Sequence, residues 1–123
     1  MEILNAVINS TYLGIEDHGI LTFWLYTEHS SGIHQYSGGY TLDEPYTSPD
    51  GQFGGRKGSA SGMDLILKIL KILNVEKWED LPGKNIRVAR DKDRMIAGIG
   101  HIIDDKWIYF KQHFEEWDSK KSR

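Results

Sequence analysis

One stretch of this chain, residues 63–73, has the pattern of a helix that is buried on most of its surface. Its polar residues are Asp64, Lys68 and Lys71, spaced by four and three, and the other positions are apolar. This predicts a helix with one narrow solvated stripe, carrying an Asp64–Lys68 pair one turn apart and capped by Ser59 or Ser61. Such a helix needs a second apolar layer to pack against.

Alternating segments on both sides of the helix predict that layer. Residues 3–8 and 20–26 indicate two strands joined by the turn sequence GIEDHG, and residues 85–103 indicate a second hairpin around DKD. Residues 34–43 indicate a further strand, interrupted by Gly38 and Gly39, where a bulge or a close backbone approach is expected. The predicted fold is α+β, a small antiparallel β-sheet with one main α-helix packed on it.

The 123 residues predict a single domain, with a compact core over about 1–110 and a C-terminal tail over 111–123. Residues 44–61 are expected to form a loop that is functional or mobile, because prolines, glycines and small polar residues cluster there. Its glycines would permit movement as a lid.

Charge and composition narrow the function classes. The net charge is −3, so the whole-molecule field does not favour long nucleic acid, and an anion site would have to be local. The chain has no cysteine, which excludes a disulfide framework and thiolate metal sites. No apolar run approaches the length of a membrane span, and no secretory signal is evident, so we expect a cytoplasmic protein without membrane partners.

The sequence GGRKGSASG before the helix has the ingredients of a local anion site. Arg56 and Lys57 precede the free backbone N–H groups of a helix start at Ser59 and Ala60. The P-loop pattern is absent, since Lys57 precedes Gly58 rather than following a GxxxxG frame. A capped helix behind a solvated basic loop explains the same residues equally well.

Catalytic and metal-binding patterns are missing from the sequence. The five histidines form no HxH, HxxxH or HExxH pair, and no serine lies in a recognisable nucleophile motif. We therefore expect no catalytic residue, no metal and no cofactor. Aromatic residues remain as platforms for a base, although each is more often core than ligand platform; they are Trp24, Tyr40, Trp78, Trp107, Tyr109 and Phe110.

Four phrases in the same order, LGIEDHGILTF, GGYTLD, GKNIRVARD and GIGHIIDDKW, resemble the phage-encoded Thoeris anti-defence sponges of the first-described type. The resemblance spans about residues 3–107. It implies a non-enzymatic protein that sequesters glycocyclic ADP-ribose, the signal of bacterial TIR-domain defence proteins, in the cytoplasm of the infected host. It further implies a homo-oligomer, a dimer or hexamer, with pockets between protomers, and some members are expected to bind the cyclic oligonucleotide signals of CBASS defence, cyclic di- or trinucleotides.

Within these motifs we expect Arg56 and Lys57, with Ser59 and Ala60, to bind the phosphates. The remaining expected contacts are stacking by Tyr40 or Trp107, hydrogen bonds from Asp43, Asn85 or Asp105, and space cleared by Gly38 and Gly39. Two alternatives stay open. One is a phage structural or assembly module without a small ligand, and the less favoured is a cyclic-nucleotide phosphodiesterase that uses His18 or His101.

Overall fold

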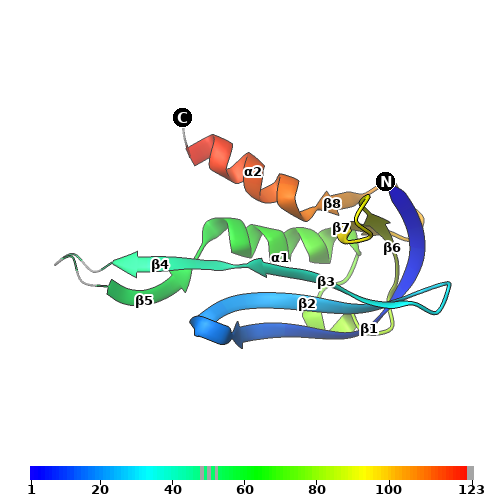
Figure 1. Cartoon of the computed structure of the whole chain (residues 1–123), viewed down its shortest axis with the longest axis horizontal. Helices are drawn as coiled ribbons and strands as arrows, with labels where there is room; N and C mark the ends of the chain where they lie inside the picture. Colours follow the sequence, from blue (N-terminus) through cyan, green and yellow to red (C-terminus); the bar gives the residue numbers. More distant parts are fainter. Residues whose placement is uncertain (48, 50, 52, 122–123) are drawn as a thin grey trace.

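An antiparallel sheet of six strands forms the body of the protein (Figure 1). The computed structural model describes residues 1–47, 49, 51 and 53–121. The strand order is β3-β2-β1-β6-β7-β8, which confirms the predicted α+β class. The strands are β1 (Glu2–Glu16), β2 (Ile20–His29), β3 (His34–Thr41), β6 (Asn85–Arg90), β7 (Ile96–His101) and β8 (Trp107–Tyr109).

Both predicted hairpins are confirmed, and in the first the turn residues account for the reversal. β1 and β2 pair up to Glu16 and Ile20, across a short 3-10 turn, Asp17–Gly19, in which His18 and Gly19 have φ values of 65° and 73°. Glycine tolerates this left-handed conformation without strain. β6 and β7 pair as the second hairpin.

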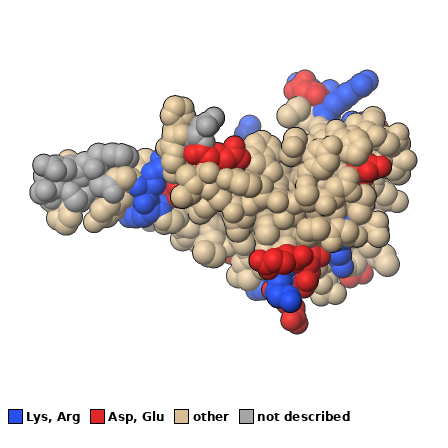
Figure 2. All heavy atoms as spheres, turned by 90° about the horizontal axis from the view of Figure 1, so that it is seen from below, with Lys and Arg blue, Asp and Glu red and all other residues tan. Residues whose placement is uncertain are grey.

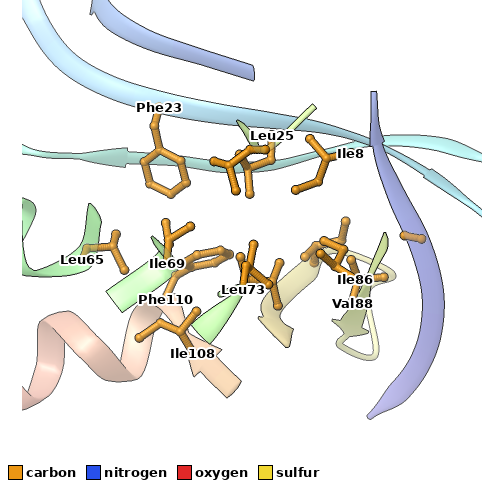
Figure 3. Close-up of a cluster of buried hydrophobic side chains, with 14 of the residues drawn as sticks. Ile8, Phe23, Leu25, Leu65, Ile69, Leu73, Ile86, Val88, Ile108 and Phe110 are labelled. Atoms are coloured by element: carbon orange, nitrogen blue, oxygen red, sulfur yellow. The ribbon is translucent and has the colours of Figure 1, made fainter. Parts of the chain in front are cut away.

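The core lies between this sheet and helix α1 (Ala60–Ile72) (Figure 3). Phe23 and Leu25 of β2 face the helix residues Leu65 and Ile69, and all four side chains are fully buried. Burying side chains of this size supplies about 1.5–3 kcal/mol each. Apolar packing against the sheet therefore contributes to holding the helix in place.

The opposite side of α1 differs from the prediction. Met63 and Leu67 are 71% and 46% exposed, so the solvated surface is wider than the stripe of polar residues and includes apolar side chains. The predicted Asp64–Lys68 pair is present, with Lys68 Nζ 3.4 Å from Asp64 Oδ2. Only one face of the helix meets the sheet.

The helix begins at Ala60, three residues before the predicted start, and its first turn is fixed to the end of β3. Ser59 is the N-cap, as expected: its hydroxyl accepts a hydrogen bond from Gly62 N at 3.0 Å and donates one to Leu42 O at 3.0 Å. A Cβ at Gly62 would lie 2.2 Å from that same Leu42 oxygen. Glycine is required there because the helix touches the backbone of residue 42.

Most of the described residues in the predicted loop over 44–61 form a second, two-stranded sheet. β4 (Asp43–Thr47) and β5 (Phe53–Gly58) pair antiparallel, with Glu44 opposite Lys57. The hairpin extends away from the body of the protein (Figure 1). Its strands cover little core, so they lack the apolar alternation by which strands are recognised.

The expected C-terminal tail is also corrected, because residues 110–121 form helix α2 (Phe110–Lys121). His113 is only 2% exposed and connects α2 to α1: its Nε2 is 2.8 Å from Ser61 O, and its Nδ1 is 3.1 Å from Lys68 Nζ. Because the carbonyl can only accept and the ammonium can only donate, the ring fits protonation at Nε2. Trp117 Nε1 donates to Asp64 Oδ2 at 3.0 Å.

That Asp64 carboxylate carries a second contact between the helices. Burial raises its pKa, but hydrogen bonds from Trp117 and Lys68 outweigh burial and hold the pKa below its ordinary value. The two helices are thus joined by a polar network as well as by apolar packing. Phe110, Phe114 and Trp117 are spaced i, i+4 and i+7, as in an amphipathic helix, and this signal was missed among the many charged residues of the segment.

His29 is buried where the sheet curls back on itself. It is 2% exposed, and neither ring nitrogen has a hydrogen-bond partner among the described residues. Nearby, β3 approaches the β6–β7 turn, where Gln35 Nε2 donates to Arg94 O at 2.7 Å. Burial, and then the positive charge of Arg90, lower the pKa of His29, against a smaller opposing effect of Glu2.

We expect this histidine to make the protein less stable in mild acid. The unfolded chain takes up a proton at the ordinary histidine pKa while folded His29 takes one up only at a lower pH, so stability falls as the pH drops below about 7.5. Urea denaturation across this range measures the slope. His29→Leu should flatten it and the exposed-site variant His34→Gln should not; an unchanged slope in His29→Leu would contradict the assignment.

Candidate functional site

A surface cleft of about 510 Å³ lies between the β1–β2 turn and the β4–β5 hairpin. It is lined by two segments far apart in the sequence. The turn contributes Ile15, His18, Gly19 and Leu21, and the hairpin side contributes Asp43, Gly55, Arg56, Lys57 and Gly58. The cleft therefore brings together three of the predicted ligand residues, Asp43, Arg56 and Lys57.

Arg56 and Asp43 are bound to each other inside this cleft. Arg56 Nη2 lies 2.8 Å from Asp43 Oδ1, and their side chains are 22% and 8% exposed. The other carboxylate oxygen, Oδ2, accepts the Leu21 backbone N–H at 3.0 Å. The hydrogen bond from Arg56 holds the pKa of Asp43 below its ordinary value, against the effect of burial. The pair fixes the hairpin to β2, which is a positioning role that the sequence did not predict.

Lys57 is the more available cation. Its Nζ lies 3.7 Å from Glu44 Oε1, with the two side chains 53% and 36% exposed, and 5.6 Å from the centre of the Tyr46 ring. An exposed pair of this kind contributes little, typically about 0–1 kcal/mol. A ligand phosphate can therefore displace the Glu44 carboxylate at small cost.

At the helix start, the predicted phosphate-binding residue Ser59 makes hydrogen bonds within the protein. The Ser59 hydroxyl bonds Leu42 O and Gly62 N, and neither Ser59 nor Ala60 lines the cleft. The expectation that the helix start and the basic pair form one site in a single chain is thus not met. The capped helix, one of the two interpretations left open, describes Ser59.

Gly38 and Gly39 make room for protein side chains rather than for a ligand. Their φ values are 109° and 82°, and the β2–β3 register shifts beside them, which confirms the predicted bulge. A Cβ on Gly38 would lie 2.7 Å from the Phe23 ring, and one on Gly39 would lie 2.3 Å from the Trp24 ring. In this structure the space beside the two glycines is therefore occupied by side chains of β2 and not left open for a nucleotide.

The two predicted stacking residues lie apart from this cleft. Tyr40 is half-buried, with its ring centre 5.3 Å from Phe110 and 5.8 Å from Phe114, and it lines a separate surface cleft of about 310 Å³ together with Phe114. Burial raises its pKa. Trp107 lies 4.9 Å below the Arg87 guanidinium, and it lines a separate cleft of about 410 Å³ together with Lys68 and Lys71.

The remaining predicted contacts lie elsewhere again. Asn85 lines a third cleft, of about 530 Å³, near the β2–β3 turn, and Asp105 is exposed in the turn between β7 and β8. The predicted ligand residues thus occupy several places on one chain. A single binding site would therefore contain only some of these residues, unless a second copy of the protein supplied the others.

His18 lines the cleft, although sequence reasoning considered it only as a candidate catalytic histidine. It lies in the left-handed turn that forms one wall of the cleft. Its signal was the GIEDHG turn itself, in which a polar side chain precedes a glycine. Turn residues of this kind project from the sheet and reach neighbouring segments.

The described residues hold no group of three or more His, Cys, Asp or Glu side chains able to bind a metal ion. Within the same residues, neither helix is long and apolar enough to cross a membrane. Comparisons with protein-family models, curated proteins and solved structures find no match to this chain. The assignment of function therefore depends on the residues themselves.

Proposed function

We propose that this chain binds and sequesters a small nucleotide signal, glycocyclic ADP-ribose, without cleaving it. The observation that carries the proposal is the cleft between the β1–β2 turn and the β4–β5 hairpin. Two of the phrases that resemble the Thoeris sponges, LGIEDHGILTF and GGYTLD, end or turn at this cleft, next to Arg56 and Lys57. A volume of about 510 Å³ suits a ligand of this size, since such pockets span about 300–1,000 Å³.

The charges in the cleft suggest how a phosphate would be held. Lys57 would exchange its exposed contact with Glu44 for the phosphate, while Arg56 would keep Asp43 and the hairpin in place. His18 faces the same space from the turn. Tight capture of a small ligand requires contacts from several sides, which favours a pocket completed by a second copy of the chain.

The proposal therefore includes a homo-oligomer acting in the cytoplasm of the infected host. The exposed Met63 and Leu67 on α1 are suited to a contact between copies, because apolar side chains on a helix surface gain by burial. Cyclic di- or trinucleotides remain additional proposed ligands. A pocket between copies is the place where they would bind.

Lys57→Ala should weaken nucleotide binding about ten-fold or more, since a charge-assisted contact is worth about 1.5–3 kcal/mol. Isothermal titration with glycocyclic ADP-ribose measures this, and Lys92→Ala, an exposed lysine in the β6–β7 turn, is the matched control. Equal affinities for the two variants would remove Lys57 from the site. Arg56→Ala is a poorer probe, because it leaves the Asp43 carboxylate without its partner and should lower the melting temperature as well.

A module without a small ligand is the second candidate, favoured by the contacts that the Tyr40 ring makes with Phe110 and Phe114 away from the proposed nucleotide cleft. It predicts that no nucleotide raises the melting temperature. Sequestration predicts a rise that grows with ligand concentration, because a ligand that binds only the folded state stabilises it.

A further inference from the structure

A further pocket, of about 390 Å³, lies on the face of the sheet opposite the core. It is lined by Tyr12 and Glu16 of β1, Trp24 of β2 and Tyr36 of β3. Tyr12 and Trp24 are direct partners across β1 and β2, and Trp24 lies between the core residues Phe23 and Leu25, so its side chain points to the other face. None of these four residues belongs to the proposed nucleotide cleft.

The rings of this pocket form a fixed corner. The Trp24 and Tyr36 ring centres are 5.7 Å apart, and their planes meet at 73°. The Trp24 ring lies over Gly39, and the Tyr36 ring also contacts the Tyr26 ring, with centres 4.9 Å apart. The Tyr12 hydroxyl donates to Ile15 O at 2.8 Å, which holds the third ring at its tip. A corner of nearly perpendicular rings can surround a rounded group, whereas a flat group would contact one ring only.

The electrostatics of the pocket favour a cation. Glu16 accepts a hydrogen bond from Trp24 Nε1 and is the only charged residue in the lining. Aromatic faces are themselves negative and attract cations, and tryptophan attracts them most strongly. In Figure 2, which views the protein from the side on which β1 and β2 lie, much of the middle of this face carries no charged side chain.

We propose that Tyr12, Glu16, Trp24 and Tyr36 form a binding site for a methylated ammonium group of a small molecule. The rounded cation would fill the corner between Trp24 and Tyr36, and the Glu16 carboxylate would balance its charge. A guanidinium would fit less well, because its plane would stack on only one of the two rings. This site is independent of the nucleotide cleft, so either can fail without the other.

Choline is the probe, and its uncharged isostere 3,3-dimethyl-1-butanol is the comparison. The Trp24 indole N–H resonance is assigned by its loss in Trp24→Phe, and it should shift saturably with choline at millimolar concentration. The neutral isostere should bind at least about five-fold more weakly than choline. Glu16→Gln and Tyr36→Ala should each weaken choline binding about five-fold. Glu28→Gln, a carboxylate on β2 outside the pocket lining, is the matched control and should bind normally.

Three results would overturn the proposal. Equal binding of choline and its neutral isostere would show an apolar surface without selectivity for charge. No shift of the Trp24 resonance with choline would show that the site is absent. A shift that follows protein concentration rather than choline would show that the pocket is a contact between copies. Since Tyr36 is exposed, Tyr36→Ala should keep its fold, and its amide spectrum confirms this.

Discussion

Phe110→Ala should lower the free energy of unfolding by about 3–5 kcal/mol, the largest effect expected from one substitution in this protein. Phe110 is fully buried, and its ring centre lies 5.8 Å from Phe23 and 5.3 Å from Tyr40. It is the first residue of α2 and directly follows β8. Removing the ring leaves a cavity where β2, β3 and α2 meet.

Urea denaturation followed by circular dichroism measures this loss. A domain of this size is stable by only about 5–15 kcal/mol, so the loss in Phe110→Ala should be a large share of the total stability. Phe110→Leu keeps most of the volume and is the matched control, with an expected loss of about 1.5 kcal/mol or less. If Phe110→Ala were as stable as the parent, α2 would not be part of the core.

Gly62→Ala should destabilise the protein by about 1–3 kcal/mol, although alanine is the better helix former. The added Cβ would lie 2.2 Å from Leu42 O and 2.7 Å from the Leu42 carbonyl carbon. Backbone atoms cannot rotate out of the way as a side chain can, so α1 would have to move from the end of β3. The same movement would strain the Ser59 cap, which also bonds Leu42 O.

Gly58→Ala is the matched control, because a Cβ there would meet nothing within 4 Å. Its free energy of unfolding should stay within about 0.5 kcal/mol of the parent. Thermal melts of the two variants should differ by several degrees, at about 4 °C per kcal/mol. Equal melting temperatures would mean that α1 and residue 42 are not in close contact.

Local signals in the sequence were enough to predict the central elements. The apolar period over residues 63–73, the Ser59 cap and the turn residues at 14–19 each act within a few residues, and the structure confirms the helix and both hairpins. Two segments were missed. β4 and β5 form a local hairpin, but their glycine- and proline-containing sequence lacks the apolar alternation of a strand. α2 is held by His113, Trp117 and Phe110 against residues 45 or more positions away.

The candidate site could be predicted only in part, because it depends on which residues strand pairing places side by side. Arg56 and Lys57 were expected to act together, yet strand pairing places one beside Asp43 and the other beside Glu44. Those partners lie 13 residues earlier in the chain, and the pairing follows from the β4–β5 register rather than from composition. Tyr40 and Gly39 serve packing on α2 and β2, which no local pattern indicates.

Release of bound ligand tests the proposed function most directly. The purified protein would be incubated with glycocyclic ADP-ribose, freed of unbound ligand and heat-denatured, and the released compounds identified by chromatography and mass spectrometry. Sequestration predicts that the intact signal returns in a near-stoichiometric amount, and that Lys57→Ala retains less of it than Lys92→Ala. Recovery of a cleaved product would indicate an enzyme, and recovery of no nucleotide would contradict binding of this signal.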